Sequence, residues 1–245
     1  MEPSASFFDR TALLTGPDVM QRLASTRVLL FGVGGVGSWC AEGLVRSGVG
    51  HLTLVDPDRV APTNVNRQMM ATSRTIGRLK VEALRDRLLE IHPAADIRCE
   101  ARFFSEETAE DFDWDSYDYV IDAIDSLKDK AALILRACRS RAVFFSSMGA
   151  ALKLDPTRVR VAEFWQVRGC PLGAALRKKY RQKGVLPARK FLCVYDDEVL
   201  PNRGRSDETC AYKAVINGSA APVTALFGFT LASLVLQDVY RKGIG

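Results

Sequence analysis

A glycine-rich turn near the start of the chain constrains the fold more than any other feature. The apolar run 27–31 leads directly into residues 32–37, Gly-Val-Gly-Gly-Val-Gly, which fit the pattern G-x-G-x-x-G between a strand and a helix. A segment with helical spacing, 36–47, and a second apolar run, 51–55, follow. Because a strand, a helix and a strand in this order form a right-handed parallel unit, the sequence predicts an α/β fold with a doubly wound sheet.

The same alternation of apolar runs and helical spacing continues to about residue 150 and then weakens. We therefore expect one Rossmann-like domain over 1–245, in which a mostly parallel sheet over about 1–150 binds a nucleotide. A basic crossover segment and a C-terminal helix, over about 151–245, would extend that domain. Beyond residue 55 the sequence predicts helices over 76–91, 128–139 and 171–180, and strands over 97–101, 117–121, 142–146 and 159–165.

Composition and length place the chain among soluble globular proteins. Hydrophobic residues make up 47% of the chain and charged residues 26%, which is ordinary for that class. The first residues show no basic start followed by an apolar run, so we expect a cytoplasmic protein without a secretory signal. One stretch, 214–237, lacks charge and approaches the length of a membrane-spanning helix. Polar and helix-breaking residues at 217–219 and 222 interrupt it, so we expect a buried core helix over 223–236 and no membrane span.

The glycine-rich turn predicts a nucleotide site. Glycines let backbone N–H groups and a helix N-terminus approach a phosphate, and Gly32, Gly34, Gly35 and Gly37 stand at the required positions. Asp56 ends the second apolar run, where a carboxylate accepts hydrogen bonds from ribose hydroxyls. These features alone fit an NAD-dependent dehydrogenase as well as an ATP-dependent enzyme.

A dense polar set downstream of the second apolar run separates these two classes. Hydride transfer needs no pair of arginine and lysine beside the nucleotide, whereas triphosphate chemistry needs positioned cations to neutralise the reacting phosphate. Both cations are present, as Arg67 and Lys80, and favour ATP as the ligand. The full set just outside the carboxyl ends of the strands is Asp56, Asp58, Asn64, Arg67, Gln68 and Lys80.

These motifs, in this order, resemble those of the ThiF/MoeB adenylating superfamily, whose members activate carboxylates with ATP. Arg10 stands where the superfamily has an arginine that reaches the ATP of the partner subunit, so the resemblance also implies a homodimer. The match covers roughly residues 7 to 165. It rests on the glycine-rich turn, D-x-D at 56–58, N-x-N-R-Q at 64–68, the helix residue Lys80 and Ile-Asp-Ala-Ile-Asp-Ser at 121–126.

The resemblance implies a role for each matching residue. Asp56 would hold the ribose, Asn64, Arg67 and Lys80 would contact the phosphates, and Asp125 would bind Mg²⁺ near the α-phosphate. Arg67, Lys80 and Asp125 would be catalytic, because cations must offset the repulsion between a carboxylate and the phosphate that it attacks. The implied ATP contacts are together Arg10, Gly32, Gly34, Gly35, Gly37, Asp56, Asp58, Asn64, Arg67, Gln68, Lys80, Asp122 and Asp125.

Three of these assignments have simpler alternatives. Asp122 would only cap the following helix, Arg10 would be an ordinary surface charge, and Gln68 would only orient Arg67. Each alternative predicts a different environment for the side chain.

The cysteines bear on the branch of the superfamily. Members that activate ubiquitin-like sulfur carriers typically hold a structural zinc with two C-x-x-C pairs, but none of the six cysteines of this chain belongs to such a pair. Cys193 and Cys210 are left either as acyl or sulfur acceptors or as buried thiols. The pattern argues against the sulfur-carrier branch, and we assign no catalytic cysteine.

A basic segment follows the region of this match. Between Phe164 and Tyr195 there are eight Lys or Arg residues and no acidic residue. Such a run is either a solvated face or, beside an ATP site and with Tyr180 interleaved, a surface for a phosphate backbone. The candidate nucleic-acid contacts are Arg177, Lys178, Lys179, Arg181, Lys183, Arg189 and Lys190.

Within the superfamily the chain most resembles the tRNA threonylcarbamoyladenosine dehydratases, over nearly its whole length. The resemblance implies that the substrate is tRNA carrying threonylcarbamoyladenosine, and that adenylation of the threonyl carboxylate precedes closure of a hydantoin ring. It leaves room for a partner from a sulfurtransferase system. Two other classes stay open, an activator of a sulfur-carrier protein and a non-catalytic scaffold that binds nucleotide. The matching segments are Val-Ile-Asp-Ala-Ile-Asp-Ser at 120–126, Pro-Leu-Gly-Ala-Ala-Leu-Arg at 171–177, Cys193, and Asn-Gly-Ser at 217–219.

Overall fold

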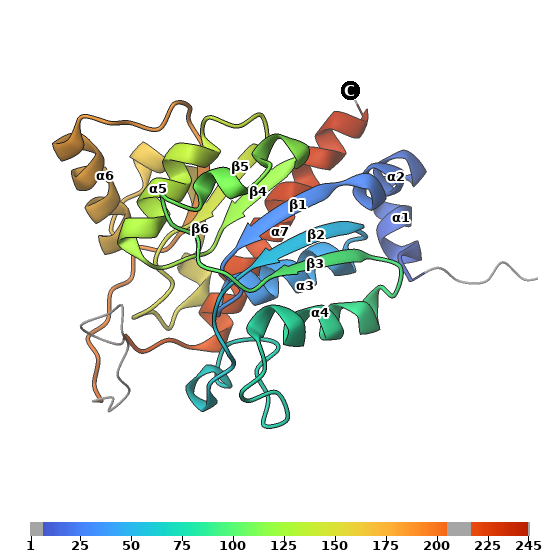
Figure 1. Ribbon diagram of the computed structural model, residues 1–245, viewed down its shortest axis with the longest axis horizontal. Helices are drawn as coiled ribbons and strands as arrows, with labels where there is room; N and C mark the ends of the chain where they lie inside the picture. Colours follow the sequence, from blue (N-terminus) through green and yellow to red (C-terminus); the bar gives the residue numbers. More distant parts are fainter. Residues whose placement is uncertain (1–6, 205–216, 245) are drawn as a thin grey trace, which may run out of the picture.

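A seven-stranded sheet forms the centre of the molecule (Figure 1). The computed structural model describes residues 7–204 and 217–244. Neighbouring strands are parallel except for β6, which is antiparallel to β7 at one edge. The predicted α/β, mostly parallel, Rossmann-like fold is confirmed. In spatial order the strands are β3 (Asp96–Glu100), β2 (His51–Val55), β1 (Arg27–Phe31), β4 (Tyr119–Asp122), β5 (Val143–Ser147), β7 (Leu192–Tyr195) and β6 (Arg160–Glu163).

Helices cover both faces of the sheet, as a doubly wound fold requires (Figure 1). One face carries α3 (Gly37–Arg46), α4 (Lys80–Ile91) and α7 (Ala221–Ile244), and the other carries α5 (Leu127–Ala137) and α6 (Pro171–Lys183). Five short 3-10 helices lie in the connections: η1 (Pro62–Asn64), η2 (Ala109–Asp111), η3 (Trp114–Ser116), η4 (Pro156–Arg158) and η5 (Phe164–Gln166).

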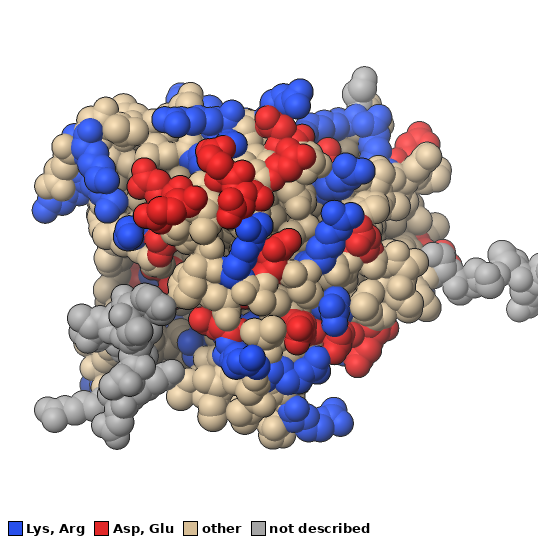
Figure 2. Space-filling model, in the orientation of Figure 1, with Lys and Arg blue, Asp and Glu red and all other residues tan. Residues whose placement is uncertain are grey.

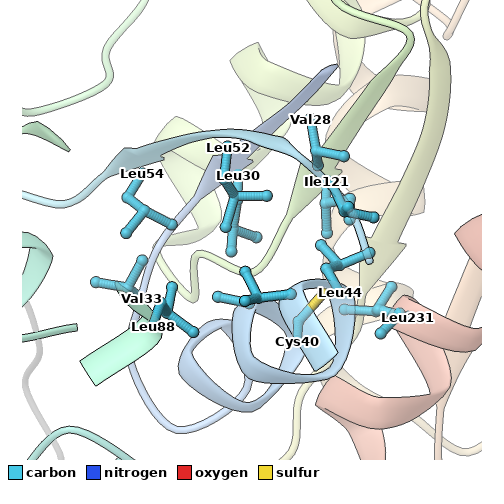
Figure 3. Close-up of a cluster of buried hydrophobic side chains, with 14 of the residues drawn as sticks. Val28, Leu30, Val33, Cys40, Leu44, Leu52, Leu54, Leu88, Ile121 and Leu231 are labelled. Atoms are coloured by element: carbon cyan, nitrogen blue, oxygen red, sulfur yellow. The ribbon is translucent and has the colours of Figure 1, made fainter. Parts of the chain in front are cut away.

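Each face of the sheet has its own hydrophobic core, because successive strand residues point to opposite faces. On β1, Val28 and Leu30 pack toward α3, while Leu29 and Phe31 pack toward α5. Figure 3 shows the first of these cores, where Leu30 lies among side chains from β2, β4, α3 and α7. Residues 28–31 are all apolar because this part of the central strand is buried on both faces, and only Arg27 at its start is exposed.

Two helices precede β1 and were not predicted. They are α1 (Asp9–Thr15) and α2 (Pro17–Ser25), which lie at the amino end of β1 (Figure 1). A Cβ atom on Gly48, just beyond the end of α3, would lie 2.8 Å from the Met20 side chain and 3.8 Å from Phe8. Both helices therefore sit at the end of α3 that is remote from the glycine-rich turn.

The last helix, α7, is longer than the predicted 223–236, and residues 214–216 of the charge-free stretch lie outside the described residues. Pro222 falls in its first turn, where a missing N–H costs nothing. By length and hydropathy α7 is the single candidate membrane span among the described residues. It packs closely along α3, however, since a Cβ on Gly228 would lie 2.5 Å from the Val36 carbonyl oxygen. That contact belongs to a core helix, as predicted.

Other boundaries differ from the predictions for local reasons. The helix expected from residue 76 begins at Lys80, because Leu79 forms an isolated antiparallel bridge with Arg59. The strand β7 was not predicted at all. It inserts between β5 and β6, and thereby joins the segment after residue 150 to the same sheet.

Candidate active site

The predicted site lies at the carboxyl ends of β1, β2 and β4. β1 is the strand from which the chain turns first toward β2 and later toward β4, and ligands of open parallel sheets bind at such a reversal of strand order. The loops that follow these three strands carry the glycine-rich turn, Asp56 and Asp125. The fold therefore gathers motifs that lie about 90 residues apart in the sequence.

The glycine-rich turn packs too tightly for side chains at two positions. Gly32 has φ +83°, and a Cβ on it would lie 2.9 Å from the backbone of Ala123. A Cβ on Gly37 would lie 1.8 Å from the Gly32 carbonyl oxygen. The turn is further tied by the Ser38 hydroxyl, which donates to the Gly34 carbonyl oxygen at 2.7 Å. Since α3 begins at Gly37, this turn presents a helix N-terminus suited to a phosphate.

Asp56 is held beside the turn by two backbone N–H groups. Val33 donates to its Oδ2 at 2.8 Å and Asp58 donates to its Oδ1 at 3.0 Å. The residue is 7% exposed, and this burial raises the pKa of Asp56, while Lys80 and the two N–H donors act in the opposite direction. The carboxylate thus lies at the end of β2 where ribose recognition was predicted.

Lys80 joins the same cluster from the first residue of α4. Its Nζ lies 2.6 Å from Asp58 Oδ2 and 3.9 Å from Asp56 Oδ1. The side chain is 8% exposed, so its charge is held in place by surrounding atoms. An ammonium has three N–H donors and Asp58 accepts one of them. Donors therefore remain for phosphate oxygens.

The motif 64–68 forms a tight loop against the start of α3. Asn64 is buried, and its side-chain oxygen accepts from the Ala61 N–H at 3.0 Å, so this oxygen supports the loop itself. The Arg67 guanidinium donates to the Thr63 carbonyl oxygen and to Asn66 Oδ1, both at 3.0 Å. A Cβ on Gly35 would lie 3.3 Å from Arg67 Cγ. The loop therefore brings Arg67 against the glycine-rich turn.

Gln68 has an unused acceptor in this region. The residue is 6% exposed, and in the described part of the chain its Oε1 has no hydrogen-bond partner. Its Nε2 lies 3.8 Å from the position of a Cβ on Gly34. A buried polar atom without a partner costs free energy, so Gln68 Oε1 is a candidate acceptor for a donor on a bound nucleotide.

Asp122 differs from its predicted role as a nucleotide contact. It is fully buried, and its Oδ2 accepts from Lys130 Nζ and from the Ser146 hydroxyl, both at 2.7 Å. Its Oδ1 accepts from the Ile124 N–H at 3.2 Å. Burial raises the pKa of Asp122, and Lys130 is the main opposing group. The alternative as a helix cap is also wrong, since Ser126 caps α5. Asp122 instead fixes the loop that leads to Asp125.

The buried Lys130 was missed in the sequence. It has no exposed surface, and its Nζ donates to the Ile124 carbonyl oxygen at 2.8 Å in addition to its ion pair with Asp122. The sequence did contain a signal for a buried lysine, because Lys130 stands on the face of α5 that carries the apolar Ala131 and Ile134. A lysine on such a face needs a carboxylate partner.

Asp125 lies beyond β4 and is exposed, at the end of this fixed loop. The described residues contain no group of three His, Cys, Asp or Glu side chains that could hold a metal ion by themselves. Mg²⁺, however, is usually bound by one or two carboxylates together with substrate phosphates and water. An exposed carboxylate beside a phosphate-binding turn fits that pattern, so Asp125 is the residue that would hold the ion.

Arg10 is not brought to the site within one chain. It is exposed on α1, at the far end of α3 from the glycine-rich turn (Figure 1). The ten residues of α3 alone separate the two ends by about 15 Å. A contact between Arg10 and a nucleotide in the turn therefore requires a second subunit.

The basic segment is only partly available to a ligand. Figure 2 shows basic side chains over α6 at the left edge of the view, and Lys178, Arg181, Lys183 and Lys190 are exposed. Lys179 and Arg177 are half-buried.

Two residues of this segment have structural roles instead. Tyr180, expected as an interleaved aromatic, is 1% exposed, and its hydroxyl donates to the Ala131 carbonyl oxygen at 3.0 Å. Arg189, expected to contact nucleic acid, donates to the carbonyl oxygens of Ala137 and Ala142 and so ties the end of α5 to the start of β5. Helical spacing explains Tyr180, which shares a face of α6 with the buried Leu176.

The cysteines offer no exposed nucleophile among the described residues. Cys193, one of the two candidate acceptors, is fully buried on β7, and this burial raises its pKa well above the ordinary value. A thiol of that kind is inert, because the thiolate is the nucleophile. The other candidate, Cys210, lies outside the described residues.

Comparisons with known proteins agree with this geometry. The model of the ThiF family matches residues 8–243. A relative from Bacillus subtilis called tRNA threonylcarbamoyladenosine dehydratase is 40% identical, and the alignment covers 96% of this chain and 94% of the relative. A relative of the same name from Haemophilus influenzae is 37% identical, and the alignment covers 92% of this chain and 90% of the relative. A crystal structure of E. coli tRNA N6-threonylcarbamoyladenosine dehydratase with ATP has a TM-score of 0.86 at 34% identity, covering 96% of this chain and 94% of that one.

A more distant structure, E. coli MccB, is 16% identical with a TM-score of 0.63, and covers 97% of this chain and 64% of that one. At that level only the fold is shared. The family match, by contrast, spans the glycine-rich turn, the cluster around Asp56, the loop to Asp125 and α6. Together with relatives that align over nearly the full length, it shows that this chain belongs to the ThiF family.

Proposed function

We propose that the protein is an ATP-dependent enzyme that converts threonylcarbamoyladenosine in tRNA to its cyclic hydantoin form, with net loss of water. The observation that carries the proposal is the cluster of Asp56, Lys80 and Arg67 against a glycine-rich turn. It combines a ribose acceptor with two cations at a helix N-terminus. The names of the relatives supply the substrate, since the aligned enzymes are tRNA threonylcarbamoyladenosine dehydratases.

The reaction begins with attack of the threonyl carboxylate on the α-phosphorus of ATP. An oxygen–phosphorus bond forms, the bond to the bridging oxygen breaks, and pyrophosphate leaves with that electron pair. Arg67 and Lys80 offset the repulsion between the two anions, and the N-terminus of α3 holds the phosphates. Asp56 orients the ribose. The product of this step is an acyl-adenylate.

Ring closure follows within the same substrate. The carbamoyl nitrogen attacks the activated carbonyl carbon, the bond to the AMP oxygen breaks, and the nitrogen loses its proton to solvent. The oxygen that the substrate loses leaves on AMP, so the modified nucleoside is lighter by one water. A five-membered ring forms with high effective molarity. No enzyme nucleophile is needed, which agrees with the buried Cys193.

Mg²⁺ is part of the proposal, with Asp125 as its protein ligand. When bound, the ion would neutralise charge on the phosphates. The side chains behind Asp125 support this role. Asp122, Lys130 and Ser146 fix the loop from inside, so the exposed carboxylate is presented at a defined place beside the turn.

We also propose that the enzyme acts as a homodimer in which Arg10 contacts the partner's ATP. Arg10 lies on α1, on which the apolar residues Leu13 and Leu14 are 82% and 79% exposed, and Phe7 just before this helix is 77% exposed. An exposed apolar group of this kind is typical of an interface. Mixing Arg10→Ala with Asp125→Ala subunits tests the arrangement. Heterodimers would form one complete site, so the mixture should recover about a quarter of wild-type activity; no recovery would argue against action in trans.

The exposed residues Lys178, Arg181, Lys183 and Lys190 of α6 and the following loop, together with the half-buried Lys179, supply the remaining cations for tRNA. Arg189 is removed from this set because its guanidinium is occupied by two carbonyl oxygens.

We place the enzyme in the cytoplasm with its tRNA substrate. A partner from a sulfurtransferase system remains part of the proposal, and co-purification from the native host with α6 variants as controls tests it.

The decisive experiment is incubation of the protein with ATP, Mg²⁺ and tRNA that carries threonylcarbamoyladenosine, followed by nucleoside mass spectrometry. We expect a loss of one water that requires ATP and vanishes in Asp125→Ala. An unchanged nucleoside would refute the proposal. If pyrophosphate exchange were then provoked by a protein tail ending in glycine, the activity would be that of a sulfur-carrier activator.

A further inference from the structure

Three arginines gather where η5 leads into α6. Arg177 and Arg181 are four residues apart on α6 and therefore project from the same face. The Cζ atom of Arg177 lies 5.9 Å from the centre of the Phe164 ring, and that of Arg181 lies 5.6 Å from the centre of the Trp165 ring. Arg168 Nη1 donates to the Trp165 carbonyl oxygen at 2.7 Å. The Phe164–Trp165 pair thus carries three guanidinium groups.

Among the described residues, this cluster has no carboxylate partner. Over residues 7–204 and 217–244, none of the three guanidinium groups forms an ion pair with a carboxylate, whereas nearby Arg158 is 2.8 Å from Asp197. Burial, together with the charges of Arg168 and Arg181, lowers the pKa of Arg177. Like charges placed this close repel one another unless an anion lies between them.

The side chains are held in place without such an anion. Arg177 is half-buried, and its Nη1 donates to the Phe164 carbonyl oxygen at 3.2 Å. The aromatic rings support the planes of Arg177 and Arg181. Arg168 and Arg181 are exposed. The result is a set of preorganised N–H donors facing solvent, which is the arrangement that recognises phosphate oxygens.

Phe164 lies at the amino end of β7, where its N–H donates to the Phe191 carbonyl oxygen, whereas the start of α6 lies at the carboxyl edge of the sheet. Gly149 follows β5, and a Cβ on it would lie 3.9 Å from Cys170 Sγ and 3.6 Å from Leu172 Cβ. The start of α6 therefore packs against the same edge that carries the glycine-rich turn. α6 therefore leads from the edge at which the adenylation chemistry is proposed to the aromatic pair that supports the arginines.

We propose that Arg168, Arg177 and Arg181 form a phosphate-binding site for the backbone of the tRNA substrate. The proposal rests on the proposed function for the identity of the RNA, and adds a defined anion site to it. Arg168 lies outside the basic run of α6 and was not among the predicted contacts. The site is distinct from the exposed lysines of α6, since its donors are fixed by Phe164 and Trp165.

The test uses the double variant Arg168→Gln/Arg181→Gln, because both side chains are exposed and their removal spares the fold. Equilibrium binding of threonylcarbamoyladenosine-tRNA is measured between 50 and 300 mM salt. Single-stranded phosphate contacts contribute about 0.7 each to the slope of log K against log salt. The double variant should therefore lower the slope by about 1.4 and weaken binding about tenfold. The KM for ATP should stay within about twofold of wild type, since the ATP residues are untouched.

Two control variants test whether the change in slope is specific to this site and whether it depends on charge. Arg98→Gln removes one exposed arginine from β3, at the opposite edge of the sheet, and should leave the slope unchanged. Arg168→Lys/Arg181→Lys keeps both charges and should restore most of the slope. An unchanged slope in the glutamine variant, or an equal fall in the Arg98 control, would overturn the proposal. The proposal would also be overturned if the glutamine variant lost binding to polyglutamate but bound tRNA like wild type. That result would indicate that the ligand of the three arginines is an acidic protein.

The outcome separates this site from the proposed reaction. Binding is measured without ATP, so it does not depend on catalysis. A wild-type protein that dehydrates the nucleoside, with a glutamine variant of unchanged slope, would refute the site and keep the reaction. A reduced slope in the variant, with a nucleoside that the wild type leaves unchanged, would keep the site and refute the reaction.

Discussion

Replacement of Lys130 by methionine tests how the loop that carries Asp125 is held. In the native chain Lys130 is fully buried, and its Nζ contacts Asp122 Oδ2 at 2.7 Å and the Ile124 carbonyl oxygen at 2.8 Å. Methionine fills a similar volume without a charge. The variant therefore leaves a fully buried carboxylate whose remaining donors are the Ser146 hydroxyl and the Ile124 N–H.

The magnitude follows from the burial of both partners. Removal of one member of a buried ion pair costs about 3 to 5 kcal/mol, because the other charge is left uncompensated. The free energy of unfolding of a typical domain is about 5 to 15 kcal/mol. For a chain of this size each kcal/mol lowers the Tm by about 2 to 4 °C, so the variant should melt about 6 to 20 °C below wild type.

The loss should also depend on pH. Burial already raises the pKa of Asp122, with Lys130 as its main opposition, so the variant should raise this pKa further. A group whose pKa is higher in the folded protein than in the unfolded protein stabilises below its unfolded pKa, and that stabilisation is lost as the pH rises through the folded value. The destabilisation by Lys130→Met should therefore be largest at alkaline pH and shrink as the pH falls.

Urea unfolding followed by circular dichroism at pH 8 and pH 5.5 measures both effects. Lys128→Met is the matched control, since Lys128 is exposed on the same helix and its replacement should change the free energy of unfolding by less than about 0.5 kcal/mol. The double variant Asp122→Asn/Lys130→Met removes the stranded charge and should be more stable than Lys130→Met alone. A loss under about 1 kcal/mol in Lys130→Met, or a double variant that is less stable still, would refute the reasoning.

Three further predictions concern single contacts. Gly37→Ala should abolish ATP binding in calorimetry, because the new Cβ would lie 1.8 Å from the Gly32 carbonyl oxygen; an affinity within about twofold of wild type would contradict the packing. Burial raises the pKa of Asp56 above the ordinary 3.8 of aspartate. If Asp56 binds the ribose as proposed, only its carboxylate form accepts from the hydroxyls, so the Kd for ATP should rise on acidification through that raised pKa. A Kd that does not change down to pH 3.8 would contradict this role. Arg189→Ala should lower the free energy of unfolding by about 1 to 3 kcal/mol, because two carbonyl oxygens lose a donor, and should leave tRNA affinity unchanged; weaker tRNA binding at unchanged stability would restore Arg189 to the tRNA surface.

Local signals account for the parts of the fold and site that were predictable. The strands β1 and β2 have the predicted boundaries, because each is a mostly apolar run that is followed directly by glycine or aspartate. Asp56 and Lys80 were assigned to one site from motif order alone, and the structure places them 3.9 Å apart. Parallel strands bring their carboxyl ends to one edge, so residues that follow different strands converge whatever the length of chain between them.

The missed elements depend on contacts that no local pattern encodes. β7 has four residues, follows a long loop, and is defined by parallel pairing with β5 and antiparallel pairing with β6. Its apolar run resembles a short piece of core as much as a strand. The helices α1 and α2 precede the glycine-rich turn; α2 packs against α7 and the end of α3, and α1 packs against α2, so the burial of α2 is set by segments far along the chain.

The two aspartates of the motif Asp122-Ala-Ile-Asp125 show how one pattern divides into two functions. Asp122 is still within β4, and strand alternation points it to the same face as Val120, into the core beneath α5. Asp125 lies three residues further, beyond the strand, and is exposed. The motif alone does not indicate which of the two aspartates is buried. Lys130 does indicate it, because a lysine on the buried face of the next helix requires a carboxylate within reach. An internal ion pair therefore fixes the loop from Asp122, and the second carboxylate of the motif, Asp125, lies at the surface, where the proposed ligand role can be tested.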